Sequence, residues 1–250
     1  MRLDRLNEIE HYIFQHGNVS LENLSNHFHV SISTIRRDIS ELLKTGSIQK
    51  VYGGVSSTAP SKMIPLKLRE TEQLEAKQHI AELASKKIQN NSALFLDTGT
   101  TISALIPYLL DKQDLTIVTN SLRVIDQVAQ THLNLFTVGG FYNREISGFV
   151  GISVQENLRN LSFSQAFISV TGVSLENGLT VNGYFEDPIK RQVLRRCGKN
   201  TILLADSTKF DQSALFSFGG LQDIGCIITE KAPPEKYLEK LQEWNVEVIY

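Results

Sequence analysis

Hydrophobic residues recur at helical spacing in three successive segments near the start of the chain. The first segment covers residues 3–15, and the second is a shorter one that ends at Phe28. The third covers residues 32–44, where four apolar side chains recur at i, i+4, i+7 and i+8: Ile35, Ile39, Leu42 and Leu43. This spacing places them on one side of an α-helix. The pattern therefore predicts three short amphipathic helices.

The opposite side of the third predicted helix carries polar and basic residues: Ser33, Arg36, Arg37, Ser40 and Lys44. The hydroxyl of Ser31 or of Ser33 can cap its first turn, and Gly46 follows where a helix most readily ends. An arginine can bind the edge of guanine with two hydrogen bonds, and hydroxyls can reach phosphates or bases. Such a helix suits the major groove of DNA.

Residues 47–55 alternate between apolar and polar types around Gly53-Gly54, which predicts a β-hairpin. Three helices closed by a small hairpin form a winged helix-turn-helix, with residues 32–44 as the recognition helix. We therefore assign residues 1–57 to a DNA-binding domain. Its predicted contacts are four side chains in the groove and two on the DNA backbone: Ser33, Thr34, Arg36 and Arg37, and Lys50 and Tyr52.

Residues 58–72 lack a sustained period and contain Pro60 and Pro65, which predicts a linker. Beyond it, helical patterns alternate with short apolar runs at residues 93–96, 115–118, 135–138, 166–170, 201–205 and 226–229. Buried strands that alternate with helices are typical of a mostly parallel sheet. The predicted fold class is an α/β domain at residues 73–250, after an all-α-rich winged helix-turn-helix N-terminal domain.

Small and polar residues follow these predicted strands, at the sheet edge where ligands bind in α/β proteins. Residues 97–101 join the first strand to a helix expected to run through Leu109, whose N-terminal end favours an anion. Similar junctions occur at residues 119–121, at Gly139-Gly140, at Gly172 and at residues 206–209. Together they predict a phosphate-binding crevice with Lys190 or Lys209 as the counter-charge.

The charge is divided unevenly along the 250 residues. The formal net charge is −2, but residues 1–69 hold nine basic and six acidic residues, and the rest holds sixteen basic and twenty-one acidic ones. A basic N-terminal part and an acidic remainder are consistent with one domain that binds the phosphates of DNA and another that does not.

Several classes of protein are excluded by what the sequence lacks. No stretch approaches the roughly 18 apolar residues of a membrane helix, and Asp4 and Glu8 interrupt what would be a secretory signal. Cys197 and Cys226 fit no metal-ligand spacing, so free thiols in a reducing cytosol are expected. We expect a cytoplasmic protein with no cofactor and no metal site.

The motif V-S-x-x-T-I-R-R-D-I at residues 30–39, followed by an apolar-x-K-x-x-G-G wing, closely resembles the N-terminal domain of DeoR-family bacterial transcriptional regulators. The family commonly has H-G-G-A where this chain has Tyr52-Gly53-Gly54-Val55, and this wing looks nearest to repressors of inositol catabolism. Tyrosine can still stack on or hydrogen-bond to a sugar-phosphate backbone, so the departure concerns sequence preference more than DNA binding.

The second half resembles the DeoR-family sensor domain, because D-T-G-T-T, T-N-S, Gly-Gly and A-D-S-T-K-F occur in its order. The resemblance implies a fold shared with ribose-5-phosphate isomerase and the CoA-transferases, and a phosphorylated sugar or polyol as effector. The residues that match the family motifs imply these effector contacts: Asp97, Thr98, Gly99, Thr100, Thr101, Asn120, Ser121, Gly140, Gly172, Glu186, Lys190, Asp206 and Lys209.

Four other functions compete with this one. An isomerase needs a carboxylate base, but residues 170–174, where the isomerases carry acids, have none. An aspartic protease needs two aspartates, and D-T-G-T occurs once, before a predicted helix. A zinc site at His27 and His29 lacks further ligands. A helix-turn-helix that binds protein rather than DNA stays open, and the salt dependence of binding separates the two.

The sequence therefore predicts a repressor of a carbohydrate-catabolism operon that a phosphorylated sugar or polyol releases from double-stranded operator DNA. The alternatives are an activator that binds DNA and a sugar-phosphate isomerase-like enzyme. Because operators are commonly symmetric, a homodimer or homotetramer is expected.

Overall fold

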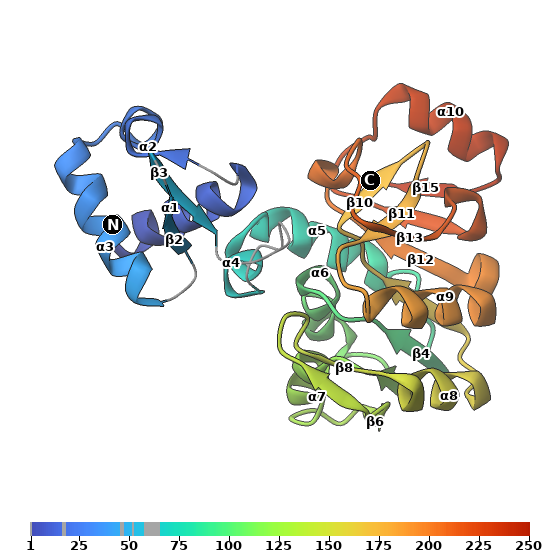
Figure 1. Cartoon of the computed structure of the whole chain (residues 1–250). Coiled ribbons are helices and arrows are strands. Elements are labelled where there is room, and N and C mark those ends of the chain that lie inside the picture. The colour runs from blue at the N-terminus through green and yellow to red at the C-terminus, as the bar shows by residue number, and fades with distance from the viewer. Residues whose placement is uncertain (1, 17–18, 46–47, 52, 58–65) are drawn as a thin grey trace. The chain divides into compact units, whose positions relative to one another are not determined.

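The computed structural model describes residues 2–16, 19–45, 48–51, 53–57 and 66–250 (Figure 1). Its contacts divide the chain into two compact units, Met1–Arg69 and Glu70–Tyr250. Each unit has a hydrophobic core cluster of its own.

The described part of the first unit is built on three helices and a three-stranded antiparallel sheet. The helices are α1 (Arg2–His16), α2 (Leu21–Phe28) and α3 (Ile32–Thr45), and the strands, in sheet order, are β1 (Val19–Ser20), β3 (Gly54–Ser57) and β2 (Ile48–Val51). Ile9, Ile13, Leu24 and Ile35 are completely buried between these elements. The winged helix-turn-helix predicted from the hydrophobic spacing is confirmed.

Part of the predicted linker is helical. Residues 58–65 lie outside the described residues. The helix α4 (Leu66–Thr71) follows them directly, and α5 (Leu74–Ser85) is the next element. The α4 sequence consists mostly of leucine, lysine, arginine and glutamate, which have high helix propensity. The linker was predicted because these residues show no hydrophobic periodicity. A helix of six residues, such as α4, is too short to show one.

The second unit is built on a parallel sheet of seven strands. In sheet order they are β15 (Glu247–Ile249), β14 (Cys226–Ile228), β12 (Thr201–Leu204), β9 (Gln165–Ile168), β4 (Ser92–Leu96), β5 (Leu115–Thr119) and β6 (Asn134–Thr137). The chain runs outward from β4 to β6 and then returns to β9, on the other side of β4. The strand order therefore reverses between β4 and β9, and ligands bind at such a reversal in open α/β sheets.

Helices cover both faces of this sheet (Figure 1). Leu94 and Leu96 face a buried cluster that also includes residues of α5, α6 (Thr100–Ser103), the 3₁₀ turn η1 (Ile106–Leu109) and α7 (Leu122–Val128). The other layer contains α9 (Glu186–Cys197), which contacts β9 and β12, and α8 (Ile152–Asn160), which packs beside α9. The last helix, α10 (Glu235–Glu243), contacts β15.

Two small antiparallel sheets complete the second unit. One contains β10 (Gly172–Ser174), β11 (Gly178–Val181) and β13 (Phe216–Gly219), and the other pairs β7 (Phe141–Asn143) with β8 (Gly148–Val150). The sequence analysis predicted neither of them. Their strands have only three or four residues, which is too short for an alternating pattern to stand out.

The two cysteines are unpaired thiols, as expected. Burial raises the pKa of Cys197 and of Cys226 to about 12, so neither is a thiolate at neutral pH. In the part of the chain that the structure describes, no helix has both the length and the apolar character to cross a membrane.

Candidate functional site

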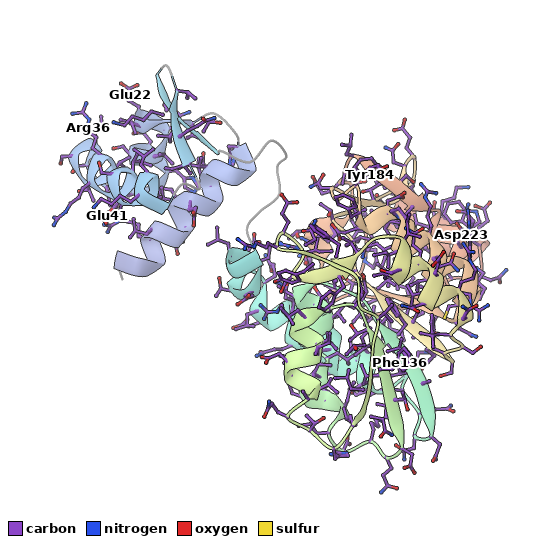
Figure 2. The ribbon with its side chains drawn as sticks, turned by 60° about the horizontal axis from the view of Figure 1, so that its bottom comes forward. Glu22, Arg36, Glu41, Phe136, Tyr184 and Asp223 are labelled. Carbon is purple, nitrogen blue, oxygen red and sulfur yellow. The ribbon has the colours of Figure 1, made fainter. Side chains whose placement is uncertain are left out.

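The polar side of α3 is open to solvent. Ser33, Arg36 and Arg37 are exposed and Thr34 is half-buried, while Ile35 and Ile39 on the other side are buried. Figure 2 shows the Arg36 side chain at the outer margin of the unit, with Glu41 further along the same helix. The four side chains predicted to enter a groove therefore lie on one accessible face.

Ser31 caps the start of α3. Its hydroxyl accepts a hydrogen bond from the backbone N–H of Thr34 at 3.2 Å and lies 2.7 Å from the hydroxyl of Ser33 and 2.9 Å from that of Thr34. The sequence left the cap open between Ser31 and Ser33, and the structure assigns it to Ser31. These linked hydroxyls hold the first turn of the helix, from which recognition helices contact base edges.

A buried carboxylate attaches α3 to α1. Asp38 is completely buried, and both of its oxygens accept hydrogen bonds from the Arg5 guanidinium, at 2.8 Å and 3.3 Å. The hydrogen bond raises the pKa of Arg5. The sequence analysis assigned no role to Asp38, although a charged residue among the apolar positions of the helix was a signal. The pair ties the helix that carries Arg36 and Arg37 to α1.

We predict that Asp38→Asn weakens binding to operator DNA several-fold and lowers the thermal midpoint of the first unit. The amide cannot accept the two charge-assisted hydrogen bonds, so α3 loses its attachment to Arg5. Circular dichroism and fluorescence anisotropy with labelled operator would measure the two effects. Glu41→Gln removes a partly exposed carboxylate from the same helix and is the matched control. Equal behaviour of the two variants would contradict the prediction.

The wing presents Lys50, which is exposed on β2. Tyr52, the other predicted wing contact, lies outside the described residues. Both glycines at the turn from β2 into β3 are required by the local backbone geometry. Gly53 has a φ of +82°, and a Cβ at Gly54 would lie 2.1 Å from the carbonyl oxygen of Val19. The Gly-Gly sequence is thus needed to turn the hairpin and to bring β3 against β1.

In the second unit, the loop after β4 meets the end of β9 at the reversal of strand order. Asp97 accepts hydrogen bonds from the Ser169 N–H at 3.0 Å and from the ammonium group of Lys190. Lys190 also donates to the Ser169 carbonyl at 2.9 Å, and Ser169 donates to the Thr98 carbonyl at 2.8 Å. Asp97 is 2% exposed and Lys190 is 1% exposed. Three segments are thus tied together by one buried ion pair.

This pairing changes the role expected of Lys190. The sequence analysis proposed it as a counter-charge for phosphate, but its charge is already compensated by Asp97. Lys209 differs, because its side chain is 33% exposed and its ammonium lies 3.7 Å from Asp206. Asp206 itself is buried and accepts hydrogen bonds from the backbone and hydroxyl of Thr208. Of the two predicted lysines, Lys209 is the one with an accessible charge.

The helix after the β4 loop is shorter than predicted. The expected continuous helix through Leu109 is α6, with four residues, followed by the 3₁₀ turn η1. Pro107 lacks an N–H donor and so interrupts the α-helical hydrogen bonding. Gly99 at the start has a φ of +128°, and a Cβ there would lie 2.5 Å from the Ser169 hydroxyl. Four residues provide only a weak helix dipole, so the predicted anion preference has less support than the sequence indicated.

The loop after β5 presents an unpaired acceptor. Asn120 is 1% exposed and donates through Nδ2 to the Phe149 carbonyl at 2.9 Å, while its Oδ1 has no hydrogen-bond partner among the described residues. Ser121 caps α7 through its hydroxyl. A Cβ at Gly148 would lie 2.6 Å from the Thr98 side chain and 3.0 Å from the Asn120 carbonyl. The β7–β8 hairpin therefore packs directly over both loops.

Three further predicted residues lie outside the loops after β4 and β5. Gly140 is exposed beyond β6, Gly172 begins β10 in the antiparallel sheet, and Glu186 begins α9. β9 ends at Ile168, two residues before the predicted apolar run ends, and Gly172 follows it as the first residue of β10. Ser169 was missed, although a hydroxyl residue inside an apolar run was a signal.

Acidic, histidine and cysteine side chains do not gather into a group of three suited to a metal within the described ranges. The two histidines considered as zinc ligands have other surroundings: the His27 ring lies 4.2 Å from that of Tyr12, and His29 ends α2 with a φ of 51°.

Comparisons with known proteins point to one family. Residues 5–61 match the DeoR-like helix-turn-helix domain, and residues 72–231 match the DeoR C terminal sensor domain. The chain is similar to the HTH-type transcriptional regulator IolR of Bacillus subtilis (strain 168), with 36% identity over 98% of each chain. It is also similar to the glycerol-3-phosphate regulon repressor of Escherichia coli (strain K12), with 29% identity over 98% of this chain and 97% of the relative. A solved ribose 5-phosphate isomerase A from Methanocaldococcus jannaschii has a TM-score of 0.42 and 16% identity over 56% of this chain and 55% of that one.

Proposed function

Because this chain belongs to the DeoR family, we propose that it is a cytoplasmic, sequence-specific repressor that a phosphorylated sugar or polyol releases from operator DNA. The observation that carries the proposal is the α3 face, where Arg36 and Arg37 are exposed beside a capped first turn. Relatives named as transcriptional regulators over nearly the full length support the same function.

The proposed DNA contacts divide by chemistry. Ser33, Thr34, Arg36 and Arg37 contact bases and phosphates in the major groove, and Lys50 contacts the backbone from the wing. Tyr52 is proposed as a second wing contact on its sequence alone. Because a two-fold operator places equal half-sites about one helical turn apart, we propose that the protein binds as a homodimer or a homotetramer.

The proposed effector site lies where the loops after β4, β5 and β12 come from neighbouring or nearby strands of one sheet. The buried Oδ1 of Asn120 accepts a hydrogen bond from a hydroxyl of the effector. Lys209 provides a positive charge near the phosphate of the effector. Asp97 and Lys190 hold the β4 loop against Ser169, and Gly99 to Thr101, Ser121 and Asp206 complete the surroundings. The contributions of Gly140, Gly172 and Glu186 rest on the family resemblance.

We propose that this site binds without catalysis. Sugar-phosphate isomerisation requires a carboxylate that is free to take a proton from carbon. The buried carboxylates near the loops are engaged, Asp97 with Lys190 and Asp206 with Thr208. The segment from Val170 to Ser174 contains no acid.

Operator titrations test the proposal. Full-length protein is titrated onto labelled DNA from its own upstream region, with and without saturating pentose, hexose, glycerol and inositol phosphates. We expect salt-sensitive binding, because phosphate contacts release counterions, and a lower affinity with at least one effector. An affinity that no sugar phosphate changes would refute the sensor assignment. Binding that is insensitive to salt would favour the protein-contact alternative instead.

A further inference from the structure

We infer that the second unit contains another ligand site, for a small polyhydroxylated molecule such as a sugar or cyclic polyol, in the cavity between α5 and α7. The cavity has a volume of about 290 Å³. Its polar lining includes Glu70, Lys77, Thr100, Ser103, Arg123 and Gln127. This volume lies close to the lower end of the range for small-molecule sites. The inference goes beyond the proposed function, since only Thr100 also belongs to the proposed effector set.

Two buried polar atoms on α7 lack partners. The Nε of Arg123 and the Oε1 of Gln127 are both buried, and neither has a hydrogen-bond partner among the described residues. The two residues are four positions apart, so they lie on the same side of the helix. Buried polar atoms are almost always satisfied, and each exception calls for a water or a ligand. A single ligand group that satisfies both atoms would accept a hydrogen bond from Arg123 Nε and donate one to Gln127 Oε1.

A hydroxyl is the group that meets this requirement, because it both donates and accepts. The Arg123 guanidinium is held by an ion pair with Glu70, so its Nε has a fixed direction. A carboxylate or phosphate ligand could accept from Nε but could not donate to Gln127. A donor and an acceptor on the same side of α7 therefore favour an alcohol over a simple anion.

The remaining walls also suit a sugar. Tyr108, Pro107 and Leu74 line the cavity and provide apolar surface for the C–H faces of a ring. Lys77 is 5% exposed and donates to the Glu72 carbonyl at 2.6 Å. Glu70 offsets the charge of Arg123, so this pair gives the cavity no net positive charge that would favour an anion. A polyol needs hydrogen-bond partners for its hydroxyls and apolar surface for its C–H groups. Arg123 and Gln127 offer the first, and Tyr108, Pro107 and Leu74 offer the second.

Isothermal titration of the full chain with myo-inositol, glucose and ribose tests the inference. We expect saturable binding of at least one of these uncharged probes. Gln127→Met should weaken it about tenfold, since one hydrogen bond is lost and a ligand hydroxyl is left unpaired. Gln130→Met changes an exposed residue of the same segment and should leave the affinity unchanged. Absence of saturable binding by all three probes, as for a cavity that holds only water, would overturn the inference.

A second variant keeps the test decisive if Gln127→Met fails to fold. Ala104 lines the cavity, and Ala104→Met should occupy part of it and weaken polyol binding. Asn120→Ala removes the acceptor proposed for the effector site and should leave polyol affinity unchanged. Loss of polyol binding in Asn120→Ala would show that the two sites are one and would refute a separate cavity site. The release of operator DNA by sugar phosphates is measured in a separate experiment. Failure of the cavity site and failure of the proposed repressor function can therefore be told apart.

Discussion

Lys190→Met is expected to lower the free energy of unfolding of the second unit by about 3–5 kcal/mol, because it leaves the carboxylate of Asp97 buried without its partner. Both side chains are at most 2% exposed, so solvent does not screen the loss. The Ser169 carbonyl, which accepts from the same ammonium at 2.9 Å, loses a hydrogen bond as well. Urea unfolding measures the effect. Trp244 is the single tryptophan of the chain and lies in the second unit, so its fluorescence reports on that unit.

The double variant Asp97→Leu/Lys190→Met is the control for this prediction. Replacing both charges by apolar side chains removes the uncompensated carboxylate, and buried ion pairs replaced in this way often lose little stability. The double variant should therefore be more stable than Lys190→Met. A single variant as stable as the parent would show that water reaches Asp97 and that the pair does not hold the loop.

Arg37→Ala is expected to reduce discrimination between the operator and unrelated DNA by about 1–3 kcal/mol, roughly 5- to 150-fold, if the guanidinium forms two hydrogen bonds with a base. Arg37 is exposed on α3. Anisotropy titrations with operator and with scrambled DNA at several salt concentrations would measure both affinities. Binding to scrambled DNA should change little.

Arg37→Lys separates base recognition from charge. Lysine keeps the positive charge but lacks the planar pair of donors, so operator preference should fall while the dependence on salt stays the same. A uniform loss of affinity on every DNA sequence in Arg37→Ala would reassign the residue to a phosphate contact, and the preference would then have to come from other residues of the helix.

The first unit was predictable because its elements are defined by near neighbours. The spacing of Ile35, Ile39 and Leu42 predicts both the helix and its buried side, and the exposure of Arg36 follows from the same geometry. Asp38 was the exception. Its partner, Arg5, lies 33 residues earlier, and no periodicity connects a carboxylate to a cation in another helix.

In the second unit the sequence predicted each polar loop separately. It did not predict which residues of these loops contact one another. Asp97 and Lys190 were both identified, yet they are 93 residues apart, and the sequence assigned both to a ligand rather than to each other. Ser169 was missed because the apolar run around it suggested a longer strand. Pro107 was overlooked as a helix breaker because the apolar spacing continued across it.

By itself, the sequence determined the two-part organisation, the winged helix with its exposed arginines, the alternation of strands and helices, and the family. Each of these depends on contacts within a few residues, or on motifs read along the chain. Only the tertiary structure decided which strands are neighbours, that the order reverses between β4 and β9, and that Lys190 neutralises Asp97. The physical reason is that an ion pair or an unsatisfied buried atom, such as Asn120 Oδ1, depends on packing between distant segments.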